Sequence, residues 1–143
     1  MTPESAFQIA SLLNSQNQLT IPYTAQKILS DESRYLVKFG QREEVLGAAE
    51  VKKVQWYQCE ILHVTVSPLA RRQGIGTWLV RAAEKRATEL GARIVQCTIR
   101  IHNQESEGLF LKLGYVRTVT FHNADSGNDV GVYEKVLDIP RAS

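Results

Sequence analysis

Cysteine is scarce in this chain. Cys59 and Cys97 are the only two in 143 residues, and neither belongs to a Cys-x-x-Cys motif or pairs with histidine at ligand spacing. The pattern argues against a disulfide framework or a metal site, so both are expected to be buried free thiols and no metal is expected. Long apolar runs are also missing, which argues against a membrane span or a signal peptide and favours a soluble cytoplasmic protein.

An excess of charge of one sign is missing as well. The formal net charge is +2, too small to indicate a nucleic-acid partner. Two basic pairs, Lys52-Lys53 and Arg71-Arg72, are interpreted as a solvent face and an anion site. The apolar content of 43% and charged content of 22% are those of a globular protein. We therefore expect one domain over residues 1–138 with a short tail at 139–143, and neither a nucleic-acid nor a membrane partner.

Two familiar phosphate loops are absent. The chain has no Gly-x-x-x-x-Gly-Lys-Ser/Thr, and the third glycine of a dinucleotide fingerprint would fall at Leu79. What is present, at 62–77, is a β-branched strand that leads through a basic turn with Gly74 and Gly76 into an amphipathic helix. Because the first turn of a helix has unpaired N–H groups and the positive end of the dipole, this turn predicts a pyrophosphate site on backbone amides.

The remaining elements follow from caps and periodicity. Thr2 is expected to cap a first helix with Pro3 at its first position, and the predicted apolar stripe is Phe7, Ile9, Ala10, Leu12 and Leu13. A second short helix is predicted at 24–30. Further helices are predicted at 77–90, with Leu90 on the apolar face and Gly91 ending it, and from Asn103 through 113.

Strands are predicted in the segments between these helices, with a polar loop at 122–129. Their ranges are 34–39, 45–54, 59–66, 92–101, 115–121 and 130–137. The strand-helix-strand unit at 59–101 requires a parallel pair inside an otherwise antiparallel sheet. The predicted fold class is therefore α/β, with a mixed, mostly antiparallel sheet and flanking helices.

With these elements in this order, the chain resembles the GCN5-related N-acetyltransferase superfamily, whose members transfer an acetyl group from acetyl-CoA to an amine. The resemblance rests on three motifs in order. They are Val66-Ser67-Pro68, the phosphate motif Arg71-Arg72-Gln73-Gly74-Ile75-Gly76, and Asn103 followed by Leu109-Phe110-Leu111-Lys112-Leu113-Gly114-Tyr115. It covers about 34–137 and implies a sheet that splays between the strands 59–66 and 92–101, where the pantothenate arm of CoA inserts.

The resemblance also implies which residues bind CoA. Main-chain groups of Val64 and Val66 would bond the arm, and Asn103 would bond it from the opposite side with Phe110 packed against it. The pyrophosphate would lie on the basic turn, formed by Arg71, Arg72, Gln73, Gly74, Ile75, Gly76 and Thr77.

Acetyl transfer requires a neutral amine, so a base must take a proton from an ammonium whose pKa is about 10. Glu60 lies eleven residues before Arg71, which matches the general-base glutamate of the histone-acetylating branch. His63 is an alternative proton relay. Phe110 stands where the family often has a tyrosine that protonates the CoA thiolate. That proton would then come from Tyr115, Tyr133 or water, or the thiolate, with a pKa of about 8.5, would leave unprotonated.

A first strand usual in the family is missing, because a helix cap already stands at Thr2. Strand 34–39 is then a sheet edge that a helix or a second subunit would cover, which motivates a homodimer hypothesis. The predicted function is an N-acetyltransferase for a primary amine of a small molecule or protein, entering beside 3–30 and 122–129. The alternatives are a catalytically silent acyl-CoA sensor or interaction module and a toxin-like acetyltransferase for charged tRNA.

Overall fold

The computed structural model describes residues 1–138, and the predicted tail at 139–143 lies outside the described residues. The chain divides into two compact units. The first unit is Met1–Val51 with His63–Ala83, and the second unit is 52–62 with the described residues from 84 to 138. Strands β2 (Val45–Gln55) and β3 (Gln58–Val66) and helix α3 (Ile75–Glu89) each contribute to both units. The prediction of one domain over 1–138 stays a prediction.

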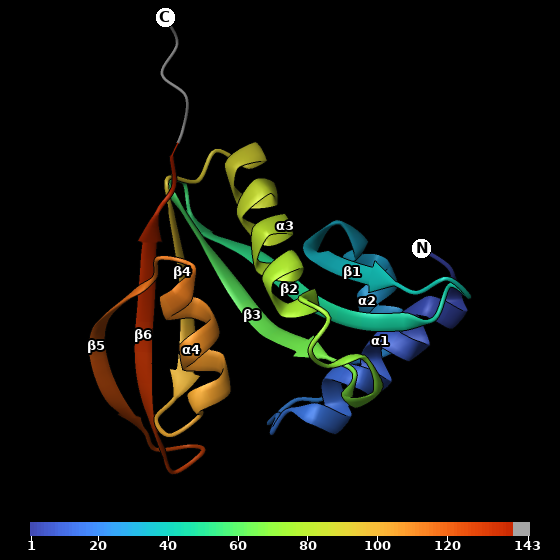
Figure 1. The fold of residues 1–143 in the computed structure, drawn as a ribbon, viewed down its shortest axis with the longest axis horizontal. Coiled ribbons are helices and arrows are strands. Elements are labelled where there is room, and N and C mark those ends of the chain that lie inside the picture. Colours follow the sequence, from blue (N-terminus) through green and yellow to red (C-terminus); the bar gives the residue numbers. More distant parts are fainter. Residues whose placement is uncertain (139–143) are drawn as a thin grey trace, which may run out of the picture. The chain divides into compact units, whose positions relative to one another are not determined.

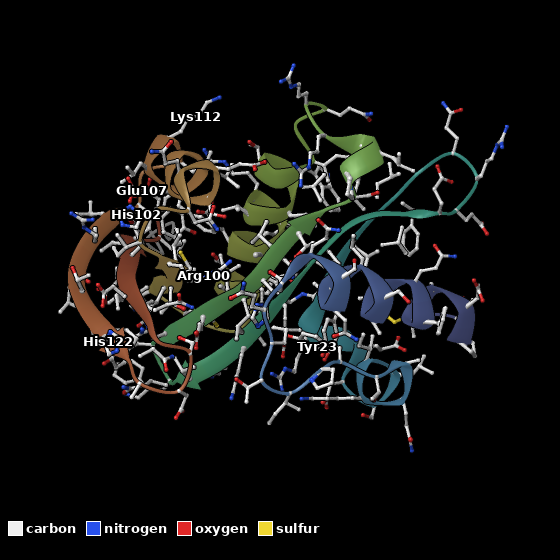
Figure 2. The ribbon with its side chains drawn as sticks, turned by 90° about the horizontal axis from the view of Figure 1, so that it is seen from below. Tyr23, Arg100, His102, Glu107, Lys112 and His122 are labelled. Carbon is white, nitrogen blue, oxygen red and sulfur yellow. The ribbon has the colours of Figure 1, made fainter. Side chains whose placement is uncertain are left out.

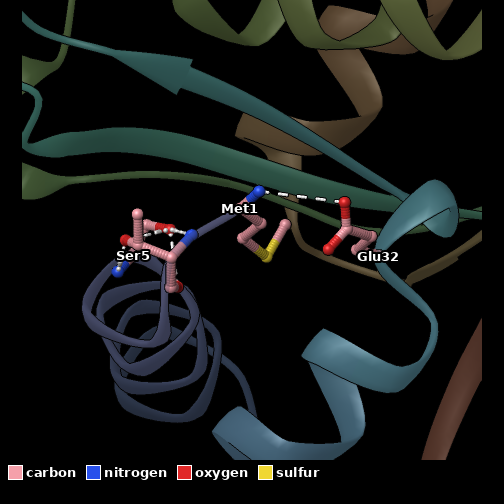
Figure 3. A network of polar contacts seen from close by, with 4 residues as sticks. Met1, Ser5 and Glu32 are labelled. Atoms are coloured by element: carbon pink, nitrogen blue, oxygen red, sulfur yellow. Dashed lines mark hydrogen bonds and ion pairs between the residues drawn. The ribbon is translucent and has the colours of Figure 1, made fainter.

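The first unit begins with two helices, α1 (Pro3–Gln16) and α2 (Ala25–Ser30), followed by the 3-10 turn η1 (Glu32–Arg34). Thr2 caps α1 as predicted. Its Oγ1 accepts a hydrogen bond from the Ser5 amide at 3.1 Å, and the Ser5 Oγ accepts one from the Thr2 amide at 3.0 Å (Figure 3). The Met1 amino group lies 3.8 Å from Glu32. These contacts fix the start of the chain against η1.

The apolar side of α1 is narrower than predicted. Ile9, Ala10 and Leu13 are buried, together with Ser5 and Ala6. Phe7 is 60% exposed, so its place in the stripe was wrong. The buried apolar residues of α1 pack on β1 (Tyr35–Phe39) and β2 (Val45–Gln55) in one cluster, whose other members are Tyr23, Ile28, Tyr35 and Ala48. This cluster is the core of the first unit.

The second unit holds β4 (Ile94–Arg100), α4 (Gln104–Lys112), β5 (Val116–Asn123) and β6 (Asn128–Val136). Helix α4 lies on one face of β4 and β6 (Figure 1). The predicted caps are confirmed, since Asn103 is the N-cap of α4 and Gly91 has a φ of 86° after α3; Gly114, with a φ of 96°, follows α4 in the same way. A glycine tolerates this left-handed conformation, which ends each helix.

Hydrogen bonds order the six strands β1-β2-β3-β4-β6-β5. The pair β3 and β4 is parallel, with Gln58 opposite Ile94 and Glu60 opposite Gln96, and the pairs β1 with β2, β4 with β6 and β5 with β6 are antiparallel. The mixed, mostly antiparallel sheet is therefore confirmed. β1 is an edge strand among the described residues, as predicted for strand 34–39, and helices precede it.

Most predicted boundaries shift by one or two residues, and three of the differences change an interpretation. α3 begins at Ile75, inside the predicted glycine turn, because its first hydrogen bond runs from the Trp78 amide to the Gly74 carbonyl. Leu90 follows the helix and is 41% exposed, so it is not on the buried face. Only the middle of the predicted loop 122–129 is a turn, at 124–127, because His122 pairs with Asp129 and Asn123 with Asn128 at the ends of β5 and β6.

Cys59 and Cys97 are both buried and free, as predicted. Burial raises the pKa of both thiols, and the charge of Glu60 raises that of Cys97 further. Within residues 1–138, no helix is long and apolar enough to cross a membrane.

Candidate functional site

The predicted phosphate turn is an exposed loop between two anchored ends. At its start the Ser67 amide bonds the Leu46 carbonyl of β2 at 2.8 Å, and Ala70, at the end of the 3-10 turn η2 (Pro68–Ala70), is buried. Arg71, Arg72, Gln73 and Gly74 are all exposed. Ile75, which follows the loop, is buried as well, so both flanks are held and the loop presents a defined backbone to solvent.

Two residues with a left-handed backbone conformation shape this loop. Arg72 has φ of 65° and Gly74 has φ of 73°. The Trp78 amide is the first to bond within α3, so the amides of residues 74–77 belong to the unpaired first turn. A Cβ placed on Gly74 would meet no atom within 4 Å. The backbone here is open to an approaching anion, and its amides and the helix dipole suit the oxygens of a pyrophosphate.

Gly47 of β2 supports the start of α3, and sequence reasoning did not identify it. A Cβ at Gly47 would lie 2.8 Å from Ile75 Cγ2 and 3.0 Å from Leu79 Cδ1. Real Cβ atoms do not approach so closely, so a side chain there would push the first turn of α3 away. The signal in the sequence was a lone glycine inside a strand, which often marks such a close approach.

The end of β3 in the first unit is irregular. His63 has a left-handed φ of 53°, and the Thr65 Oγ1 donates to the His63 carbonyl at 2.7 Å. Asn17 of the first unit donates to Thr65 Oγ1 at 2.9 Å. Val64 and Val66 are half-buried on this segment. The bonds predicted between their main-chain groups and the CoA arm stay predictions.

His63 lies beside a buried polar cluster that the sequence did not reveal. Glu50 is 4% exposed, accepts a hydrogen bond from the Tyr23 hydroxyl at 2.7 Å (Tyr23 is labelled in Figure 2) and pairs with Arg34. The Tyr23 ring meets the His63 ring edge-on at 5.8 Å. Burial lowers the pKa of His63 and raises that of Tyr35 to about 12. A neutral His63 can accept a proton.

Glu60, the predicted base, lies in the second unit. It is half-buried and stands opposite Gln96 of β4, whose side chain is hydrogen-bonded to Gln58. Its neighbour Cys59 points to the opposite face and is buried. The side-chain carboxylate is thus held on the face of the sheet opposite to the buried thiol.

Helix α4 carries two further predicted residues. The Asn103 side chain accepts a hydrogen bond from the Ser106 amide at 3.3 Å, so it serves as the helix cap. Phe110 is 4% exposed and packs edge-on against Tyr115, with ring centroids 4.9 Å apart. The ring of Phe110 is therefore part of the core of the second unit.

The two tyrosines considered as replacement acids have other partners. The Tyr115 hydroxyl donates to Glu84 at 2.8 Å, and Lys135 donates to the same carboxylate at 3.0 Å. The Tyr133 hydroxyl is hydrogen-bonded to Glu107 of α4, which is labelled in Figure 2. Burial, followed by Glu107, raises the pKa of Tyr133. A raised pKa makes Tyr133 a weaker acid for a thiolate.

Comparisons with known proteins identify the fold. The yncA protein from Salmonella typhimurium, solved with its cofactor acetyl-CoA, has a TM-score of 0.81 and 19% identity over 100% of this chain and 94% of that chain. Ard1 from Thermoplasma volcanium has a TM-score of 0.80 and 22% identity over 97% of this chain and 95% of that chain. At these identities the likeness shows the fold alone.

A relative in sequence is an uncharacterized N-acetyltransferase in the lysA 3′ region of Bacillus methanolicus. It is 32% identical over 69 residues, and the match spans 48% of this chain and 58% of the relative. The model of the Acetyltransferase (GNAT) family matches residues 5–115, which is well over half of the chain. The exposed turn at the start of α3 lies inside the matched region. The chain therefore belongs to the Acetyltransferase (GNAT) family.

Proposed function

We propose that this protein is an acetyl-CoA-dependent N-acetyltransferase that acts on a primary amine of a small molecule or protein. The observation that carries the proposal is the open, left-handed turn at Arg72 and Gly74, which leads directly into the 15-residue helix α3. Such a turn suits a pyrophosphate, which CoA contains. Membership of the Acetyltransferase (GNAT) family supports acetyl-CoA as the donor.

In this proposal the amides of 72–77 hold the pyrophosphate, while Arg71, Arg72 and the Thr77 hydroxyl add polar contacts. Main-chain groups of Val64 and Val66 bond the pantothenate arm. Asn103 and Phe110 belong to the second unit. The bond predicted between Asn103 and the CoA arm, and the packing predicted for Phe110 against that arm, stay predictions. When bound, acetyl-CoA supplies a thioester whose acetyl group a neutral amine can take as the CoA thiolate departs.

Glu60 is the proposed base that takes the proton from the ammonium form of the acceptor. A carboxylate is a weak base for an ammonium, so Glu60, directly or through a water, produces a small population of the neutral amine, which then attacks the thioester carbonyl as the C–S bond breaks. His63, whose pKa burial lowers, is the second candidate. Because Phe110 has no proton to give, the CoA sulfur leaves as a thiolate or takes its proton from water.

Release of free CoA thiol from acetyl-CoA, followed with a chromogenic disulfide over a panel of amines, tests the function. The wild-type protein should release thiol only when an amine is present. Glu60→Gln should lower kcat about a hundredfold or more at unchanged CoA affinity. Glu105→Gln, on an exposed carboxylate in the first turn of α4, is the matched control and should leave kcat unchanged.

Two other results would redirect the proposal. CoA binding without turnover on any amine would favour the catalytically silent acyl-CoA module. Turnover confined to charged tRNA would favour the toxin-like alternative. The homodimer proposal, which rests on the edge strand β1, is tested by light scattering at micromolar concentration, where a monomeric mass would contradict it.

A further inference from the structure

One face of the sheet in the second unit carries an unusual set of side chains. Directly opposed residues on neighbouring strands place their side chains on the same face. The strand registers therefore align one row across β3, β4, β6 and β5, made of Glu60, Gln96, Glu134 and Val116. We call the face that carries this row the open face. The next row on it is Thr98, Val132 and Val119, and the row after that is Arg100, Val130 and Phe121.

The opposite face is the one that the helices cover. Tyr133 of β6 bonds Glu107 of α4, and Lys135 of β6 bonds Glu84 of α3. Figures 1 and 2 agree in placing α4 on a single side of β4, β6 and β5. Within the described part of the second unit, no helix lies on the open face.

The open face exposes apolar side chains that a helix would otherwise bury. Val116 is 63% exposed, Val119 is 54% exposed and Phe121 is 45% exposed, and all three lie along β5. A register shift between Arg117 and Val119 keeps Val119 and Phe121 on the same side as Val116. A contiguous apolar strip of this kind on a soluble domain usually marks a binding surface.

The negative charges on the open face favour a cationic ligand. Glu60 and Glu134 stand in the row that ends at Val116, separated by the neutral Gln96. Neighbouring strands lie about 4.8 Å apart, so β3 and β6 are about 10 Å apart across β4, and the two long side chains can reach one ligand group from its two sides. Arg100 lies two rows further along β4. A cation beside the Glu60 row, with an apolar body over β5, matches this arrangement.

We propose that the open face binds the acceptor and that the acceptor is a primary amine with an apolar body. Its ammonium lies beside Glu134 and Glu60, and its body covers Val116, Val119 and Phe121. This proposal rests on the proposed function, because Glu60 is the base suggested there. Glu134 is a binding residue for the ammonium, and Val119 and Phe121 determine acceptor specificity.

The test compares two amines of opposite character, 2-phenylethylamine and ethanolamine, by CoA thiol release at saturating acetyl-CoA. The kcat/KM for 2-phenylethylamine should exceed that for ethanolamine about tenfold or more, because the apolar strip contributes only to the former. Phe121→Ser and Val119→Ser should lower kcat/KM for 2-phenylethylamine far more than for ethanolamine and so remove most of this preference. Val54→Ser, on an exposed valine at the end of β2, is the control and should preserve the preference.

Glu134→Gln separates the charge from the apolar contact. It should raise the KM for 2-phenylethylamine roughly threefold at constant kcat, the size expected for a partly exposed ion pair. The KM of the wild-type enzyme should also rise with salt, and that of the variant, which keeps only the Glu60 carboxylate, should rise less. Circular dichroism and thermal melts of each variant establish that it is folded.

Three results would overturn the proposal. Equal kcat/KM for both amines, with no effect of Phe121→Ser, would exclude the apolar strip while the proposed function stands. Absence of thiol release with every amine would reject the proposed function and this proposal with it. A dimer that Phe121→Ser converts to monomer, seen by light scattering, would assign the open face to a second copy of the chain.

Discussion

Replacing Gly74 by alanine separates backbone strain from ligand binding. The φ of Gly74 is 73°, and a Cβ there would meet no protein atom within 4 Å. The alanine therefore adds no clash within the protein, and its cost comes from the left-handed backbone, about 1 kcal/mol. For a chain of this length, that free energy lowers Tm by about 3 °C.

The effect on CoA should be much larger than the effect on stability. The added methyl group enters the space through which a phosphate oxygen would approach the amides of the turn. A hydrogen bond from an amide to a charged phosphate contributes about 1.5 to 3 kcal/mol, so its loss weakens CoA binding roughly ten- to hundredfold. Calorimetric titration of the purified protein with CoA measures this change directly.

Gly127 offers a matched control. Its φ is 75°, and a Cβ there also meets no atom within 4 Å. Gly127→Ala should therefore lower Tm by about the same amount as Gly74→Ala, because the backbone strain is equal, and should leave the CoA affinity unchanged. Equal CoA affinities for the Gly74→Ala and Gly127→Ala variants would refute the placement of the pyrophosphate on this turn.

Other predictions concern the buried groups. Tyr23→Phe removes the hydroxyl that donates to buried Glu50 and should cost about 1 to 3 kcal/mol of unfolding free energy, measured by urea denaturation. Cys59 and Cys97, whose pKa values burial raises, should resist a thiol reagent at pH 8 in the folded protein and react in denaturant; rapid labelling of the folded form would contradict their burial. Burial lowers the pKa of His63, so the unfolded state binds more protons and stability should fall as pH drops below about 6.5. His63→Asn should lose less Tm between pH 7.5 and 5.5 than the wild type does.

Local signals in the sequence were sufficient for most element boundaries. Thr2, Asn103 and Gly91 are caps whose chemistry acts within a few residues, so their positions could be predicted and are confirmed. Phe7 was wrongly predicted to be buried. Helical periodicity locates the apolar stripe of a helix, but it does not show how much of that stripe the rest of the protein covers. Leu90 was misplaced because the helix ends one residue before it.

Long-range contacts were beyond sequence reasoning. Glu50 is stabilised by Tyr23, 27 residues earlier. The sequence around an acidic residue in a strand does not indicate which distant residue will form a hydrogen bond with it. The close approach of Gly47 to α3 likewise depends on how the strand and helix pack. The open face depends on strand register, and the shift between Arg117 and Val119 decides which side chains share it.

The most direct measurement is an amide NMR titration of the ¹⁵N-labelled protein with CoA and, separately, with pantetheine, which lacks the pyrophosphate. If the turn holds the pyrophosphate, the amide protons of Gln73 through Thr77 should move downfield with CoA and should not with pantetheine. Saturable CoA binding that leaves these amides unshifted would contradict the central claim.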